Sequence, residues 1–111
     1  WQAGMDLAQA CYERTRSFPR EEMFGLTSQI RRSSASVPAN IAEGYGREST
    51  GDYARFLQIA QGSLKETETH ILLAARVGLL NETSCRILID RTEELGRMLR
   101  TLIRAIQARK S

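Results

Sequence analysis

Apolar residues recur along most of this chain at alternating intervals of three and four, which is the period of one face of an α-helix. The row is clearest near the C-terminus, where a parallel row of Ile89, Gly96 and Ile103 widens it into a broad stripe. A stripe of this width is typical of a helix that packs inside a bundle. The pattern therefore predicts a long helix that follows Asn81 as its N-cap and buries Cys85, Leu88, Thr92, Leu95, Leu99, Leu102 and Ile106.

A second long helix is predicted before this one. It starts at a capping box formed by Ser49 and Asp52, and it ends near Gly78. Its apolar row follows the same alternation and consists of Tyr53, Leu57, Ala60, Leu64, Thr67, Ile71 and Ala74.

The N-terminal half of the chain predicts two more helices. The first is short and buries Leu7, Cys11, Thr15 and Phe18. The other is expected to begin after the turn at Pro19, with Glu21 and Glu22 in its first turn. Its apolar face is predicted to contain Leu26, Ile30, Ser33 or Ser34, Val37, Ile41 and Tyr45.

The links between these helices are short, near residues 18–21, 46–50 and 79–82. Short links make neighbouring helices run antiparallel. We therefore predict an all-α protein, an antiparallel up-down-up-down four-helix bundle, in which residues 1–111 form a single domain.

Composition limits the classes of partner and compartment. The formal net charge of +3 and the pI near 9.2 are compatible with a nucleic-acid partner without requiring one. No run of 18 apolar residues is present, so we expect no membrane partner. Cys11 and Cys85 form no CxxC motif, and we expect buried free thiols in the cytoplasm, with a disulfide or redox role as the alternative.

The titratable residues do not predict an enzyme. His70 is the only histidine, and its place at the edge of an apolar stripe favours a structural, partly buried side chain. Di-metal bundles use Glu-x-x-His motifs from two helices, whereas Glu66 precedes His70 by four residues and no second motif exists. We therefore expect no catalytic residue, no metal and no cofactor.

Basic residues give the strongest hint of a binding function. Arg97, Arg100 and Arg104 share one face of the last helix, and no acidic residue follows Gly96. Such a row could contact phosphates without reading bases, or it could be a solvated face with cations at a helix C-terminus. Other candidate nucleic-acid-binding residues are Arg31, Arg32 and Arg47.

Two segments carry a recognisable signature. Residues 18–46 read FPREEMFGLTSQIRRSSASVPANIAEGYG, and residues 55–70 read RFLQIAQGSLKETETH. Together they resemble the four-helix bundle family of 23S rRNA-intervening-sequence proteins. The chain departs from the family pattern at Ser33-Ser34, where Ala is usual, and at Thr67, where Leu is more typical.

The resemblance implies a homo-oligomer, typically a pentameric barrel, with no established enzymatic activity. A distantly similar bundle, the accessory variability determinant of diversity-generating retroelements, is a basic pentamer that binds nucleic acid and a reverse transcriptase. For this chain we therefore expect self-association and an RNA or other nucleic-acid partner. The alternative is an adaptor for a protein partner, with incidental surface charge.

The signature residues themselves suggest a structural role. Pro38 is expected to bend its helix near Ser34, and the helix is expected to continue through Glu43. Asn40 and Glu43 could satisfy backbone groups freed by the proline, or pair across a subunit boundary. A ligand-binding or catalytic pair is the alternative for these two residues. Gly44 belongs to the loop that ends the helix.

Overall fold

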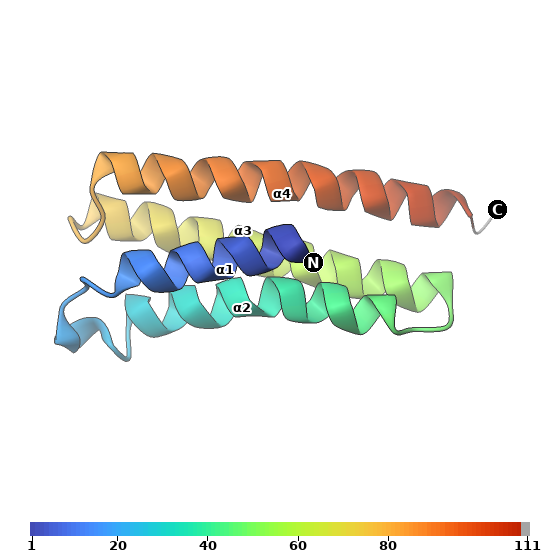
Figure 1. Ribbon diagram of the computed structural model, residues 1–111, viewed down its shortest axis with the longest axis horizontal. Helices are drawn as coiled ribbons and strands as arrows, with labels where there is room; N and C mark the ends of the chain where they lie inside the picture. The colour runs from blue at the N-terminus through green and yellow to red at the C-terminus, as the bar shows by residue number, and fades with distance from the viewer. Residues whose placement is uncertain (110–111) are drawn as a thin grey trace.

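The computed structural model describes residues 1–109 and consists of helices joined by short connections (Figure 1). The elements are α1 (Gln2–Thr15), a single 3-10 turn η1 (Arg20–Glu22), α2 (Leu26–Tyr45), α3 (Thr50–Arg76) and α4 (Glu82–Ala108). Consecutive helices run antiparallel along a body of 49 × 22 × 19 Å. The predicted all-α, up-down-up-down four-helix arrangement is confirmed.

The four helices form a square in cross-section. Each helix contacts its two neighbours around the square, α1 with α2 and α4, and α3 with α2 and α4. The contact between α2 and α3 is the most extensive, and the contact between α1 and α4 is the smallest. Helix α1 has 14 residues whereas α4 has 27, so α1 covers only part of the length of α4. One hydrophobic core lies between the helices, with Leu57, Ala60 and Ile71 of α3 at its centre.

The helix ends follow the sequence signals in most places. The Ser49 hydroxyl accepts a hydrogen bond from the Asp52 N–H at 3.0 Å, and the Asn81 side chain accepts one from the Ser84 N–H at 2.7 Å. Gly78, with a φ of +86°, lies just beyond the end of α3, where the backbone turns into the left-handed region that glycine tolerates. The predicted caps of α3 and α4 are confirmed.

The predicted start of α2 was wrong. Glu21 and Glu22 belong to η1, and α2 begins only at Leu26. The Glu22 carboxylate accepts a hydrogen bond from the Leu26 N–H at 3.2 Å, so it caps the helix from outside. Acidic residues are expected in the first turn of a helix, but Glu22 caps α2 from the turn that precedes it. The position of the acidic residues therefore did not reveal where α2 begins.

Tyr45 was also placed wrongly on the buried face. Its side chain is exposed and contacts the edge of the Tyr53 ring, with 6.2 Å between the ring centroids. Gly44 was wrongly placed in the loop: it lies inside α2 and is the buried residue at this end of the helix. As expected, the helix continues through Pro38 as far as Tyr45, and the bend near Ser34 stays a prediction. Within residues 1–109, no helix is long and apolar enough to cross a bilayer.

Candidate nucleic-acid interface

The C-terminal half of α4 presents the arginine row formed by Arg97, Arg100 and Arg104, which we call the α4 arginine row. All three side chains are exposed, and with a helical rise of 1.5 Å per residue the row is about 10 Å long. None of the ion pairs formed within residues 1–109 involves these arginines. The acidic residues of α4 all lie in its N-terminal half together with Arg86 and Arg91, so this half is net negative whereas the C-terminal half carries only positive charges.

Further arginines lie at the same end of the bundle, because the loop between α2 and α3 reaches the end where α4 stops (Figure 1). Arg47 and Arg55 both stack on the Phe56 ring, at 4.8 and 4.7 Å from its centroid. Arg47 also pairs with Glu43, which offsets part of its charge. Arg55 was not among the predicted residues, although the sequence places it next to Phe56 at the start of a helix.

Arg31 and Arg32 make contacts within the monomer. The Arg31 side chain donates to the Thr15 hydroxyl at 2.9 Å and lies 4.7 Å from the centroid of the Tyr12 ring, so it ties α2 to α1. Arg32 pairs with Glu66 of α3. Arg31 has no carboxylate partner either, but its guanidinium is held by Thr15 and Tyr12, so among the candidate cations of residues 1–109 only the α4 arginine row has neither an ion pair nor a side-chain hydrogen bond.

Pro38 and Gly44 lie where neighbouring helices approach closely. A Cβ on Gly4 of α1 would be 3.2 Å from the Pro38 side chain, so the missing side chain allows α1 to pack on the proline. A Cβ on Gly44 would lie 2.9 Å from the Phe56 Cβ and 3.2 Å from the Tyr53 carbonyl oxygen. The signature glycine is therefore required for the approach of α2 to α3.

Asn40 does not take the role expected for it, because Pro38 frees the Ser34 carbonyl and the Asn40 side chain contacts Ser36 instead. Its side-chain amide donates to the Ser36 carbonyl at 2.8 Å and to the Ser36 hydroxyl at 2.9 Å. The Ser36 hydroxyl in turn contacts the Ser63 hydroxyl of α3 at 2.8 Å. Asn40 thus supports a polar link between α2 and α3. Glu43, near the end of α2, pairs with Arg47 of the following loop.

The two departures from the family pattern contact each other. The Thr67 hydroxyl donates to the Ser33 hydroxyl at 2.9 Å, and both side chains are fully buried. Each also contacts a carbonyl of its own helix, Thr67 that of Ser63 and Ser33 that of Ile30. A buried polar group is tolerated when it is hydrogen-bonded, so the two hydroxyls satisfy each other in the core.

His70 is partly buried, and its Nε2 lies 3.3 Å from a Glu66 carboxylate oxygen that also pairs with Arg32. This arrangement joins α2 to α3 at the surface. Within residues 1–109, no three His, Cys, Asp or Glu side chains lie close enough together to hold a metal ion.

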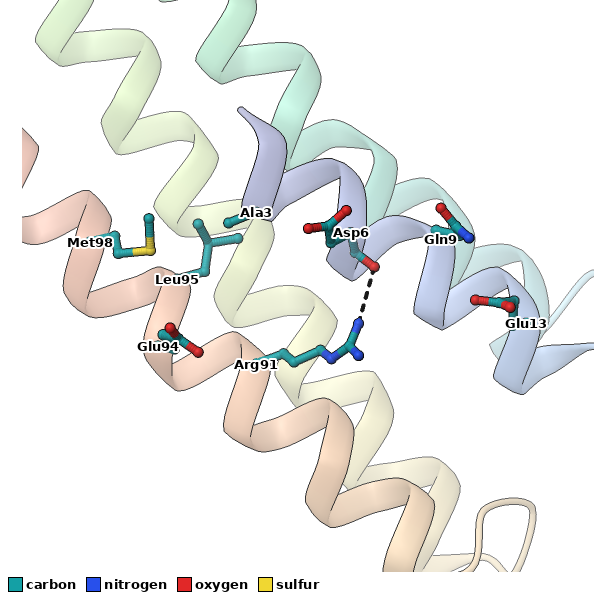
Figure 2. A pocket seen from close by; sticks show the side chains of 8 residues that line it. All are labelled: Ala3, Asp6, Gln9, Glu13, Arg91, Glu94, Leu95 and Met98. Carbon is teal, nitrogen blue, oxygen red and sulfur yellow. Dashed lines mark hydrogen bonds between the residues drawn. The ribbon is translucent and has the colours of Figure 1, made fainter.

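A cleft of about 450 Å³ separates α1 from α4 (Figure 2). Asp6, Gln9 and Glu13 line it from α1, and Arg91, Glu94 and Met98 line it from α4. The only hydrogen bond drawn across it joins the Arg91 guanidinium to the Asp6 carbonyl oxygen at 3.5 Å. The cleft marks the loosest contact between neighbouring helices, and its mixed charges suit neither a polyanion nor an apolar ligand.

Comparison with known families agrees with the signature in α2 and α3. The family model for the 23S rRNA-intervening sequence protein matches residues 1–101. The chain belongs to this family. No curated protein gives a significant sequence match.

Among solved structures, one from the S23 ribosomal protein family of Bacteroides thetaiotaomicron is similar to this member of the 23S rRNA-intervening sequence protein family. That crystal structure, of a protein of unknown function, superposes with a TM-score of 0.83 at 24% identity, covering 92% of this chain and 95% of the other. At this identity the likeness extends to the fold alone.

Proposed function

We propose that this protein is a non-enzymatic, homo-oligomeric RNA-binding module whose α4 arginine row contacts phosphates. The observation that carries the proposal is the set of three exposed arginines on one helical face, with no ion-pair partner within residues 1–109. Cations at this spacing attract a phosphate backbone irrespective of base sequence. Met98 is the only large apolar side chain exposed in the C-terminal half of α4, so the row has no aromatic platform for base stacking.

The proposal includes self-association because copies of the chain would repeat the row on every subunit. A ring of copies strengthens the local positive potential and raises the rate at which a polyanion associates. Large apolar side chains remain exposed on the monomer, including Val77 and Leu72, as expected of a surface that a second subunit covers. The family resemblance implies five copies, and the two free thiols fit a cytoplasmic protein.

The proposal is tested by titrating a structured and an unstructured RNA at two salt concentrations. Affinity should fall steeply with salt, with a slope in log affinity against log salt of about −0.7 to −0.9 for each phosphate neutralised. Arg97→Gln, Arg100→Gln and Arg104→Gln together should weaken binding to both RNAs and flatten the slope. Gln forms helices nearly as well as Arg, so α4 should persist.

A matched control removes three exposed cations elsewhere, through Arg16→Gln, Lys65→Gln and Arg91→Gln. This variant loses the same net charge, so equal weakening by both variants would assign binding to total charge and contradict a localised interface. Absence of RNA binding by the parent at low salt would remove the proposal.

The alternative function is an adaptor that binds another protein. The exposed apolar residues of the bundle favour it, since patches of this kind also mark contacts with other proteins. An adaptor would bind no RNA, and the triple Gln variant would keep its protein partner.

A further inference from the structure

The connection between α1 and α2 exposes two large apolar side chains, Met23 and Phe24, which we call the connector knob. Phe24 is 91% exposed and Met23 is 49% exposed. Backbone hydrogen bonds order this segment, from the Met23 N–H to the Arg20 carbonyl and from the Gly25 N–H to the Glu22 carbonyl, both at 3.0 Å. Phe24 is therefore held in solvent by an ordered turn. This exposure is costly, because a buried phenylalanine removes about 150 Å² of surface or more from water.

A groove of about 600 Å³ lies between the C-terminal half of α3 and the N-terminal half of α4. Its apolar wall includes Leu72, which is 50% exposed, and the half-buried Cys85 and Ile89. We call it the α3–α4 groove; its wall also contains Ala75 and Leu80. The volume is large enough to receive an aromatic side chain.

The knob and the groove lie on opposite sides of the bundle at the same end. The square arrangement places the α1–α2 edge opposite the α3–α4 edge, because α1 contacts α4 and α2 contacts α3. Both the α1–α2 connection and the α3–α4 loop lie at one end of the long axis (Figure 1). A projection on one side and a matching hollow on the other are what a head-to-tail contact between identical subunits requires.

Each of the two surfaces carries charges of both signs, so each can offer an opposite charge to the other. Arg20 and Glu21 flank the knob, and both are exposed. The rim of the groove offers Arg76 on α3 and Asp90 and Glu93 on α4. None of these five residues takes part in an ion pair formed within residues 1–109. Opposite charges are thus available on both surfaces to orient one subunit on the next.

We propose that the occupant of the α3–α4 groove is the connector knob of a second copy of this chain, with Phe24 inserted against Leu72 and Ile89. The contact is heterologous, so successive copies repeat it in one direction and form a ring when the rotation closes. This inference rests on the homo-oligomer of the proposed function and specifies the surface that builds it.

The test uses one variant for each side of the contact. Phe24→Glu places a charge on the knob, and Leu72→Glu places one in the groove; both residues are at least half exposed, so neither change should unfold the bundle. Each variant alone should sediment as a 12.5 kDa monomer at concentrations where the parent is an oligomer. Tyr45→Glu is the matched control, since Tyr45 is 79% exposed on the opposite end of α2, and it should assemble as the parent does. Circular dichroism should give the same helicity for all four proteins.

Mixing the two variants distinguishes a head-to-tail contact from a symmetric one. Phe24→Glu keeps an intact groove and Leu72→Glu keeps an intact knob, so their mixture should form a 1:1 dimer of twice the monomer mass and no larger species. A mixture that remains monomeric would overturn the heterologous contact.

The remaining outcomes separate this inference from the oligomer itself. If the parent is a monomer, the homo-oligomer of the proposed function fails, and this contact fails with it. If the parent is an oligomer and Phe24→Glu still assembles fully, the oligomer stands and the knob-in-groove contact is wrong.

A cross-link gives an independent measurement. Cys85 lines the groove and is partly exposed, whereas Cys11 is buried. In a Phe24→Cys variant, diamide should accept two protons and two electrons as a disulfide forms between Cys85 of one subunit and the new thiol of the next. A non-reducing gel should then give a ladder of multiples of the monomer mass, and Tyr45→Cys should give none. A ladder of equal yield from Tyr45→Cys would contradict the placement.

Discussion

The contact between α2 and α3 and the contact between α1 and α4 differ in how closely the helices approach. Helices α2 and α3 approach closely at Gly44 and at buried small residues, and two hydrogen bonds between hydroxyl groups join them. Between α1 and α4, a cleft lined by charged side chains is crossed by one long hydrogen bond, and a second, shorter one joins Arg14 to the Ser84 hydroxyl at 2.8 Å. The comparison indicates that the α2–α3 pair specifies the fold, because its contacts depend on exact residue size.

The largest expected difference is in the rates at which the two cysteine thiols are alkylated. Cys11 is fully buried, and burial raises its pKa from 9.0 to about 11, which reduces the thiolate about a hundred-fold at neutral pH. Iodoacetamide at pH 8 should therefore modify the half-exposed Cys85 at least about a hundred times faster than Cys11. Mass spectrometry of digested protein measures both rates.

This experiment also tests the α1 contacts. Helix α1 carries Cys11, so detachment of α1 alone would expose the thiol before global unfolding. Rates for Cys11 that equal those for Cys85 would mean that α1 is not docked. Because the folded state disfavours the thiolate, stability should also fall as pH rises from 9 towards 11, and Cys11→Ala should remove this loss.

Gly44→Ala should destabilise the protein by about 2 kcal/mol. The new Cβ would lie 2.9 Å from Phe56 and 3.2 Å from a backbone oxygen of Tyr53. To relieve these contacts α2 and α3 must move apart, which weakens the packing between them. Gly62→Ala is the matched control, since no atom lies within 4 Å of its added Cβ, and it should stabilise α3 by about 1 kcal/mol. Urea unfolding of both variants measures the difference. Equal effects of the same sign would refute the close approach at Gly44.

Thr67→Val should cost about 1 kcal/mol. It removes the buried hydrogen bond to Ser33 and leaves that hydroxyl with only its contact to the Ile30 carbonyl, at 3.4 Å. In the double variant Ser33→Ala and Thr67→Val, both hydroxyls are absent and the cost should be smaller than the sum of the single changes. Strict additivity in a double-mutant cycle would mean that the two side chains do not interact.

The smallest change in the free energy of unfolding is expected for a substitution in the α1–α4 cleft. Arg91→Ala removes an exposed side chain whose one hydrogen bond across the cleft is 3.5 Å long. Its effect on the free energy of unfolding should stay within about 0.5 kcal/mol. A loss of more than 1 kcal/mol, measured by the same urea titration, would place α1–α4 on a par with α2–α3 and erase the contrast.

Much of the fold could be predicted from the sequence, because the apolar period and the caps are local signals. Both ends of α3 and the start of α4 lie where Ser49, Gly78 and Asn81 place them. The start of α2 could not be found in this way, since Glu22 caps the helix from a preceding turn. The exposure of Tyr45 depends on which neighbour the last turn meets, and helical spacing does not contain that information.

The candidate site was less accessible to sequence reasoning. Spacing alone places the α4 arginine row on one face, but only the folded chain reveals that Arg31 contacts Thr15 and that Arg32 pairs with Glu66. Likewise, Ser33 and Thr67 are 34 residues apart, so their mutual hydrogen bond could not be read from either segment. Contacts between helices decide which charges remain free.

The distribution of charge along α4 has a consequence for the proposed binding of RNA. The N-terminal half of α4 contains Glu82, Asp90, Glu93 and Glu94, and the C-terminal half ends in the arginines, so the side chains create an electric dipole along the helix. An external negative charge exerts a torque on such a dipole and turns the arginine end forward during diffusion. Orientation before collision increases the fraction of productive encounters, which speeds capture more than it prolongs the bound state.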